Sequence, residues 1–231
     1  MINKLKSKFL SMLALSVIFS LSFLLTRVGT VISLNTYAAY QTISPEKLNK
    51  YAQSMYPLLN ENNSRYCSSS HIKYKKKVFT VTNRHCCENY TYFFPYVNVG
   101  GSLESILHLS EEHDVCVLTA SKVKKPLKLA KNEVRMWESI LVMGYPMGHS
   151  LTPQAGTIIL LNHDKVWGPK IYPSHEAIVK ILPGNSGSPV LNKYGNVVGL
   201  AYATYPYEMV RGIIVPLRYV ENALDQAYNF K

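Results

Sequence analysis

Three short strings of residues supply a histidine, an aspartate and a serine in settings suited to nucleophilic chemistry. His85 ends the strand-like string VFTVTNRHC, Asp114 opens an apolar run in HDVCVL, and Ser186 lies between two glycines in PGNSGSPV. A serine hydroxyl is a weak nucleophile at neutral pH unless a base accepts its proton during attack. Histidine can act as that base, and an aspartate can fix its tautomer and stabilise its cation.

Each string alone also has a structural explanation, because His before a turn, Asp before a strand and Gly-Asn-Ser-Gly in a loop are common. The combination is more informative, since the chain order His85, Asp114, Ser186 matches one known order of a catalytic triad. Gly184 lets the backbone bend, so that the N–H groups of Gly184 and Ser186 point at one spot and form an oxyanion hole. The sequence therefore predicts acyl transfer at Ser186.

The elements that must position these residues are mostly short strands. Ser44-Pro45-Glu46 predicts the start of a helix over about 45–57, and an amphipathic helix is expected from about Leu217. Between them, many short runs without alternating helices favour antiparallel barrels or a sandwich. The β-branched and aromatic runs are Lys77–Thr82, Thr91–Val99, Ile106–Leu109, Val115–Thr119, Ser139–Met143, Thr157–Leu161, Ala177–Ile181, Val190–Leu191, Val197–Tyr202 and Gly212–Val215. The predicted fold class is all-β.

The first 39 residues read as a targeting segment. Lys4, Lys6 and Lys8 precede an uncharged apolar run over 9–25, and small residues at 36–39 offer an imperfect cleavage site. The run is at the short limit for a membrane span, so a cleaved signal peptide and a retained signal anchor are both open. In either case residues from about 40 onward are expected outside the cytoplasm, secreted or membrane-anchored. Contact with the membrane is expected only through this N-terminal segment.

Composition limits the remaining possibilities. The chain has 231 residues, of which 47% are hydrophobic, so a folded core is expected and wholesale disorder is excluded. The net charge is +11, and without residues 1–39 the chain keeps 21 basic and 14 acidic residues, a net charge of +7. The lysine-rich run at 73–77 has no matching basic groove elsewhere and is interpreted as the solvated face of a hairpin. We therefore expect no nucleic-acid partner.

The three strings resemble those of the trypsin-like serine proteases of the chymotrypsin fold. The string GNSGSPV is most similar to the bacterial branch that contains glutamyl endopeptidases and HtrA-type protease domains. Three further segments, Val142–Gly148, Asn196–Leu200 and Arg211–Pro216, resemble segments of the second barrel in that branch. The similarity covers roughly residues 60–222. It implies two six-stranded antiparallel β-barrels with a short N-terminal helix and a C-terminal helix.

The resemblance also implies how the chain is divided and what it does. We expect a helical lead-in over 40–60, a first barrel over 61–130 with His85 and Asp114, and a second barrel with the terminal helix over 131–231 with Ser186. The implied activity is that of an exported serine endopeptidase, which acts on protein or peptide substrates through an acyl-enzyme and needs no cofactor. The alternative is an inactive trypsin-like scaffold that acts as a binding module.

By the same resemblance, Lys180 lies at the position that often floors the primary specificity pocket, where it would favour an acidic substrate side chain or face solvent. Leu200, Ala201 and Tyr202 are expected to line the substrate cleft. Asn185 stands where digestive trypsins have an aspartate, so activation through a buried N-terminal amine is not expected. No histidine lies near Ala201, so the glutamate preference of the glutamyl endopeptidases is not supported.

The four cysteines allow three pairings if all are bridged. In the eukaryotic members of the resembled family the residue after the histidine is half of a disulfide, and Cys67 opens the hairpin arm opposite the one that ends at His85. Cys67–Cys86 is therefore the preferred bridge. Cys116 is interpreted as a buried free thiol. No metal site is predicted, because the cysteines lack a Cys-x-x-Cys pair.

Overall fold

The computed structural model of the chain describes residues 43–88, 96–167, 170–205 and 208–230. The predicted targeting segment, residues 1–39, lies outside the described residues. Within the described part, no helix is long and apolar enough to cross a membrane.

Helix α2, Pro45–Ala52, is the N-terminal element of the described chain. The Ser44 hydroxyl accepts a hydrogen bond from the Lys47 N–H, and proline occupies the first helical position. The helix ends earlier than the predicted residue 57 because the next residues form strand β1, Met55–Leu59, which pairs with β2. Strand pairing thus replaces the last turn of the predicted helix.

The first barrel is built from β1 and five further strands. Its hydrogen-bonded order is β1-β4-β5-β6-β3-β2, and the pairing of β2 with β1 closes the ring. A short strand, β7, Leu127–Lys128, runs parallel to β2 outside that ring. The other strands are β2 Arg65–Tyr74, β3 Lys77–Thr82, β4 Tyr96–Val99, β5 Ser102–Leu109 and β6 Cys116–Leu118.

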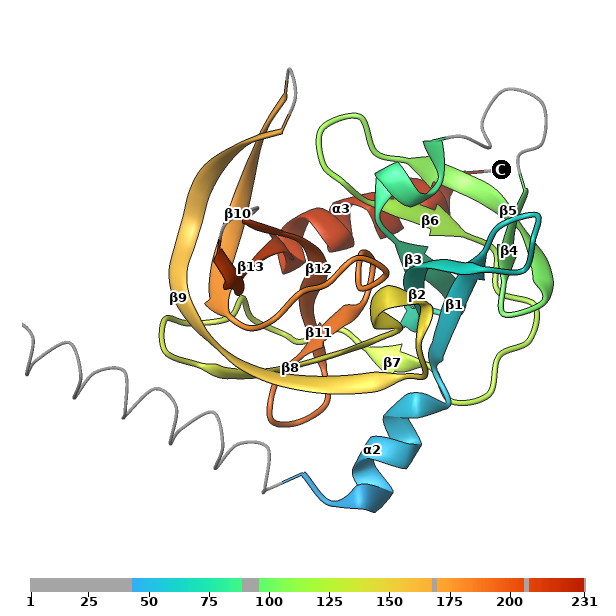
Figure 1. Ribbon diagram of the computed structural model, residues 1–231. Helices are drawn as coiled ribbons and strands as arrows, with labels where there is room; N and C mark the ends of the chain where they lie inside the picture. The colour runs from blue at the N-terminus through green and yellow to red at the C-terminus, as the bar shows by residue number, and fades with distance from the viewer. Residues whose placement is uncertain (1–42, 89–95, 168–169, 206–207, 231) are drawn as a thin grey trace, which may run out of the picture.

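The second barrel is closed by six antiparallel strands in the order β10-β13-β12-β11-β8-β9. The two barrels lie side by side, one in the cyan and green part of the chain and one in the yellow and orange part (Figure 1). Two closed six-stranded barrels confirm the predicted fold. The strands are β8 Ser139–Gly144, β9 Thr152–Trp167, β10 Lys170–Ile178, β11 Pro189–Leu191, β12 Val197–Tyr205 and β13 Glu208–Pro216.

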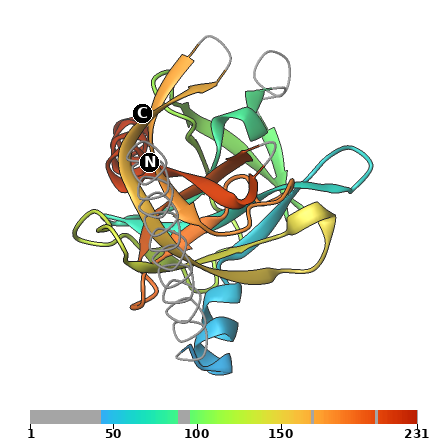
Figure 2. The ribbon, with the colours of Figure 1, turned by 60° about the vertical axis from the view of Figure 1, so that its left-hand side comes forward.

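Helix α3, Leu217–Asn229, begins at the residue predicted from the sequence. It packs against strands of both barrels, β5 and β6 of the first and β12 and β13 of the second. Both views place it against the body of the barrels near the C-terminus (Figures 1 and 2). The helix thus joins the two barrels on one side of the molecule.

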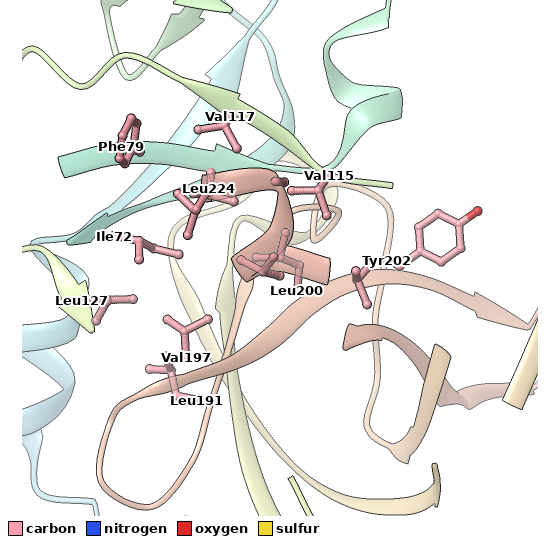
Figure 3. Close-up of a cluster of buried hydrophobic side chains, with 14 of the residues drawn as sticks. Ile72, Phe79, Val115, Val117, Leu127, Leu191, Val197, Leu200, Tyr202 and Leu224 are labelled. Atoms are coloured by element: carbon pink, nitrogen blue, oxygen red, sulfur yellow. The ribbon is translucent and has the colours of Figure 1, made fainter. Parts of the chain in front are cut away.

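The largest hydrophobic cluster lies between the barrels. It combines Ile72, Phe79 and Val117 of the first barrel with Leu191 and Leu200 of the second, all of them buried (Figure 3). Buried side chains of α3 complete it. Burial of each such side chain stabilises by about 1.5–3 kcal/mol. The same packing fixes how the two barrels face one another.

Two disulfides cross-link the first barrel, and the described residues hold no free cysteine. The preferred Cys67–Cys86 bridge is present, with 6.3 Å between its Cα atoms. The second bridge joins Cys87 to Cys116, so the interpretation of Cys116 as a free thiol is wrong. The side chains of both residues are buried in the interior of the first barrel, where their sulfur atoms meet. Each loop closure stabilises by about 3–4 kcal/mol on the chain-entropy estimate.

Candidate active site

His85 and Asp114 come from two neighbouring loops of the first barrel. His85 lies in the single 3-10 turn Arg84–Cys86 that follows β3. Its Nδ1 is 2.8 Å from Asp114 Oδ2, and its backbone N–H donates to Asp114 Oδ1 at 2.9 Å. The carboxylate is nearly buried, whereas 39% of the His85 side chain is exposed. One carboxylate therefore fixes both the backbone and the ring of the histidine, and leaves the other ring nitrogen for a reactant.

Asn83 holds the backbone of Asp114 in place through a hydrogen bond. Its side chain is fully buried, and its Nδ2 donates to the backbone carbonyl of Asp114 at 2.9 Å. The adjacent His113 stacks on Tyr219 with 3.3 Å between ring centroids, and burial lowers the pKa of His113. His113 thus packs on helix α3, and His85 is the histidine whose ring contacts the Asp114 carboxylate.

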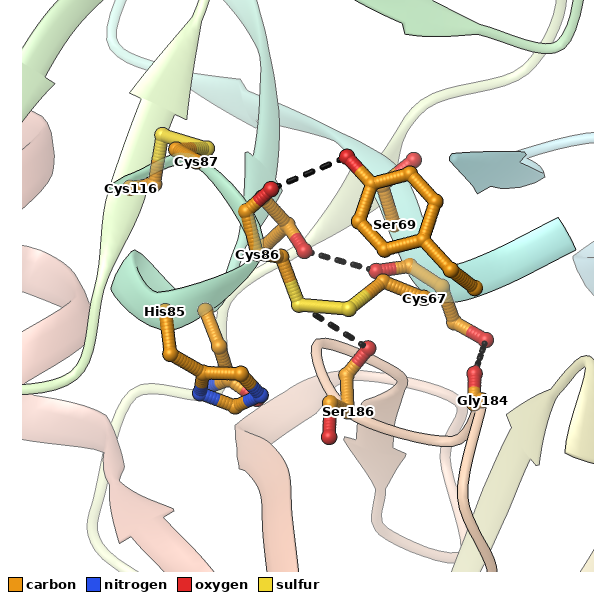
Figure 4. Close-up of a disulfide and its surroundings, with 12 residues drawn as sticks. Cys67, Ser69, His85, Cys86, Cys87, Cys116, Gly184 and Ser186 are labelled. Carbon is orange, nitrogen blue, oxygen red and sulfur yellow. Dashed lines mark hydrogen bonds between the residues drawn. A yellow bond between two sulfur atoms is a disulfide. The ribbon is translucent and has the colours of Figure 1, made fainter. Parts of the chain in front are cut away.

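Ser186 enters from the second barrel, on the turn between β10 and β11. Its hydroxyl donates to the backbone carbonyl of Tyr202 at 3.2 Å. The Tyr202 ring meets the His85 ring edge-on, with 5.9 Å between centroids. The structure thus brings the three predicted residues together, and the Ser186 hydroxyl donates to the Tyr202 carbonyl rather than to His85. Figure 4 shows His85 and Ser186 close to each other, next to the Cys67–Cys86 bridge.

The glycines beside the serine are required by close backbone approach. Gly184 has φ +90°, and a Cβ there would lie 2.4 Å from the Tyr145 carbonyl oxygen. Gly187 has φ +81°, and a Cβ there would lie 2.3 Å from the Ser68 carbonyl oxygen in the first barrel. Any other residue would be strained at these backbone angles and would also clash. Glycine at these positions lets the loop fit between the barrels.

The N–H groups of Gly184 and Ser186 are free to act as donors. Within the described part of the chain, neither group donates to a protein acceptor. A cavity of about 440 Å³ opens beside them and is lined by His85, Pro183 and the Cys67–Cys86 bridge. Two unused backbone donors next to a serine and a histidine are the arrangement that stabilises an oxyanion in acyl transfer.

The predicted substrate-binding residues fall into different environments. Lys180 is exposed and does not line the cavity beside Ser186, while its neighbour Ile181 is buried against Gly212. Leu200 and Ala201, which were also predicted to line the cleft, have completely buried side chains. Their backbones instead pair with the serine loop and the strand after it: Gly187 N–H donates to the Ala201 carbonyl at 2.9 Å.

Tyr202 does border the site, through its backbone carbonyl and its ring. Figure 3 shows its ring pointing away from the hydrophobic cluster. Two residues that contribute to the site were missed in the sequence: Asn83 and Ser68. Asn83 directly precedes the histidine turn, and that position was the available signal. Ser68 lies in a run of three serines that gives no signal of which one faces the site.

Cys67, His85 and Cys86 have potential metal-ligand atoms within 4.8 Å of one another. The two sulfur atoms are joined in a disulfide, so they are not available as thiolates. The imidazole alone remains, which is too few ligands for a structural or catalytic metal.

Comparison with known proteins gives relatives over part of the chain. An uncharacterized protein, y4bJ, of Sinorhizobium fredii is 30% identical over 97 residues, and Protease Do-like 5, chloroplastic, of Arabidopsis thaliana is 29% identical over 106 residues. These matches cover 42% and 43% of this chain. The chain spans only 15% and 33% of the lengths of those two relatives.

Solved structures share the fold. A mutant of Rv3671c from M. tuberculosis, in its inactive form, aligns with a TM-score of 0.62 and 17% identity, over 81% of this chain and 95% of that chain. The HtrA-type protease AlgW, solved with a tripeptide, aligns with a TM-score of 0.64 and 19% identity, over 79% of this chain and 62% of that chain. At these identities the likeness shows the fold alone.

The family match covers a larger part of this chain than the match to either of the two relatives. The family described as "Trypsin-like peptidase domain" matches residues 70–200, more than half of the chain. The matched segment contains His85, Asp114 and Ser186 as well as most strands of both barrels. The chain therefore belongs to the trypsin-like peptidase domain family.

Proposed function

We propose that this chain is a serine endopeptidase that hydrolyses peptide bonds through an acyl-enzyme on Ser186. The observation that carries the proposal is the meeting of a carboxylate-bound His85 with Ser186 and two unused backbone donors in one cavity. Membership of the trypsin-like peptidase domain family supports it. The substrate is a protein or peptide segment bound in the gap between the barrels.

The acylation step follows from the contacts of His85. The hydroxyl of Ser186 turns from the Tyr202 carbonyl toward the free ring nitrogen of His85, which takes the proton as Oγ attacks the substrate carbonyl carbon. The Asp114 carboxylate stabilises the resulting imidazolium through Nδ1. The protonated ring then gives the proton to the leaving amine as the C–N bond breaks.

Deacylation repeats the same steps with water. His85 takes a proton from water, the oxygen of which attacks the ester carbonyl, and the ring then returns the proton to Ser186 Oγ as the ester bond breaks. In both steps the negative oxygen lies against the Gly184 and Ser186 N–H groups. Removing one such donor typically costs about 10²–10³ in rate. We therefore expect a displacement of the backbone at Gly184 to slow both steps.

Labelling with a fluorophosphonate tests the proposal. We expect the folded chain to form one covalent adduct, on Ser186, because only an activated serine attacks this phosphorus centre. Mass spectrometry of the digested protein locates the adduct, and heat-unfolded protein is the control. A folded chain without an adduct on Ser186 would contradict the proposal and favour the inactive binding scaffold.

We further propose that the barrels work outside the cytoplasm, as a secreted or membrane-anchored domain. The two disulfides support this location, because structural disulfides persist mainly in oxidising compartments. A fusion of alkaline phosphatase after residue 42 provides the test in an export-competent bacterial host. We expect an active phosphatase, and a fusion that stays inactive inside the cell would argue against export.

A further inference from the structure

Ser68 lies on β2 of the first barrel and is buried directly under the nucleophile loop, residues 183–188 of the second barrel. Its exposed fraction is 1%. Its backbone N–H donates to the Ser186 carbonyl at 2.8 Å, and its Oγ donates to the Gly184 carbonyl at 2.7 Å. A dashed line from Gly184 in Figure 4 marks the second bond. One residue of the first barrel thus binds the loop at two points.

The Ser68 hydroxyl also accepts a hydrogen bond. The Tyr145 N–H donates to its oxygen at 2.9 Å. Tyr145 opens the turn whose third residue, Met147, donates its N–H to the Pro183 carbonyl at 2.6 Å. The Ser68 hydroxyl therefore links the nucleophile loop to the 145–148 turn, which holds the loop from its other side.

The carbonyl groups of residues 183–186 all accept hydrogen bonds. Besides the carbonyls bound by Met147 and Ser68, the Asn185 carbonyl accepts from the Ser188 N–H at 2.9 Å. Because C=O and N–H point in opposite directions across a trans peptide, fixing the carbonyls of residues 183 and 185 fixes the N–H groups of residues 184 and 186. The peptide plane between these two is held at both ends: Ser68 Oγ donates to its carbonyl, and its Asn185 N–H donates to the Leu182 carbonyl at 2.9 Å. The oxyanion-hole donors are aimed by bonds to the carbonyls around them.

We propose that the Ser68 hydroxyl is a positioning group for the oxyanion hole. It holds the Gly184–Asn185 peptide so that the flanking Gly184 and Ser186 N–H groups converge on the developing oxyanion. Without it the middle plane keeps only the bond from the Asn185 N–H to the Leu182 carbonyl. The plane can then tilt about that bond, because Gly184 tolerates a wide range of backbone angles. The loss falls on the transition state, where the hydrogen bonds of the oxyanion hole are strongest. This inference rests on the proposed function.

The neighbouring Ser69 provides a matched control. It is equally buried, at 1% exposed, and its hydroxyl also donates to a backbone carbonyl, that of Tyr56 at 3.0 Å. That bond lies within the first barrel and does not reach the nucleophile loop. Replacement of either serine by alanine removes the same atom from the same strand, so a purely structural effect appears in both variants.

The experiment compares Ser68→Ala, Ser69→Ala and the unchanged chain on a chromogenic peptide substrate and on a peptide aldehyde, which forms a tetrahedral adduct on the serine. We expect Ser68→Ala to lower kcat about 10–100-fold with KM within about twofold, since the donors are misaimed rather than removed. Affinity for the aldehyde falls in parallel with kcat/KM. Ser69→Ala keeps kcat within about twofold of the unchanged chain. Circular dichroism confirms folding at the assay temperature.

Each outcome decides between explanations. A kcat of Ser68→Ala equal to that of Ser69→Ala, in a chain that turns over substrate, overturns the positioning role and leaves the proposed function standing. An unchanged chain without turnover overturns the proposed function itself. If Ser68→Ala does not fold, the isosteric pair Ser68→Thr and Ser68→Val replaces it. Threonine keeps the hydroxyl, and equal kcat values for this pair would contradict the role.

Discussion

Ser186→Ala is expected to abolish peptide hydrolysis, with a loss in kcat on the order of 10⁶-fold. The substitution removes the oxygen that forms the acyl bond, and the remaining groups of the triad act as a unit that is ineffective without it. The fold should persist, because the hydroxyl makes one hydrogen bond, to the Tyr202 carbonyl, which contributes about 0.5–1.5 kcal/mol. Turnover of a fluorogenic peptide by purified protein measures the loss.

Ser188→Ala is the control for this prediction. Ser188 lies two residues further along the same loop, is completely buried, and its Oγ has no hydrogen-bond partner among the described residues. Its removal should leave turnover within about a factor of three, since no catalytic contact is lost. Hydrolysis by Ser186→Ala at a tenth or more of the rate of the unchanged chain would show that another residue is the nucleophile.

Asp114→Asn is expected to lower kcat by about 10⁴-fold. The asparagine amide keeps the shape of the carboxylate but places a donor against His85 Nδ1, where Oδ2 now lies at 2.8 Å. The ring then carries its proton on the wrong nitrogen and cannot accept one from Ser186. The oxygen that accepts the His85 backbone N–H at 2.9 Å can be retained, so the histidine turn should keep its place.

Asp225→Asn is the matched control, because it removes one carboxylate charge at a position away from the site. Asp225 lies on α3 and pairs with Lys75 at the surface, where an ion pair contributes at most about 1 kcal/mol. We expect its variant to keep full activity and the melting temperature to change little. If Asp114→Asn retained more than a tenth of the kcat, His85 would not depend on this carboxylate.

The sequence was most informative where chemistry and local backbone geometry coincide. Gly184 and Gly187 mark positive-φ positions, and the serine between them is therefore recognisable without a structure. Helix α3 and the barrel strands follow from hydrophobic periodicity and turn residues. The second barrel contains more strand than expected: β9 spans Thr152–Trp167, well beyond the predicted Thr157–Leu161. The end of β9 beyond Leu161 contains charged residues and lacks an apolar pattern, yet it pairs with β10.

The remaining features depend on contacts between distant segments. The partner of Cys116 could not be chosen from spacing, because it is set by how β6 passes the turn after His85. A shift of one residue decides whether Lys180 or Ile181 faces inward, because successive side chains of an extended chain point to opposite faces. Ser68 is one of three adjacent serines, and only the approach of the second barrel distinguishes it from Ser69.

The Cys87–Cys116 disulfide links the segments of His85, the proposed base, and of Asp114 covalently. Cys86 and Cys87 directly follow His85, and Cys87 is bridged to Cys116, two residues after Asp114. The hydrogen-bonded pair is thereby contained in a small ring that involves only the first barrel. Ser186 has no such tether and reaches the pair only through packing and hydrogen bonds between the barrels.

The distance between Ser186 and His85 therefore depends on how closely the two barrels pack. A small opening of the molecule would withdraw the nucleophile while the imidazole and its carboxylate stay paired. If Ser186 acts as we propose, activity depends on how the two barrels dock, and helix α3, which contacts both barrels, stabilises that docking.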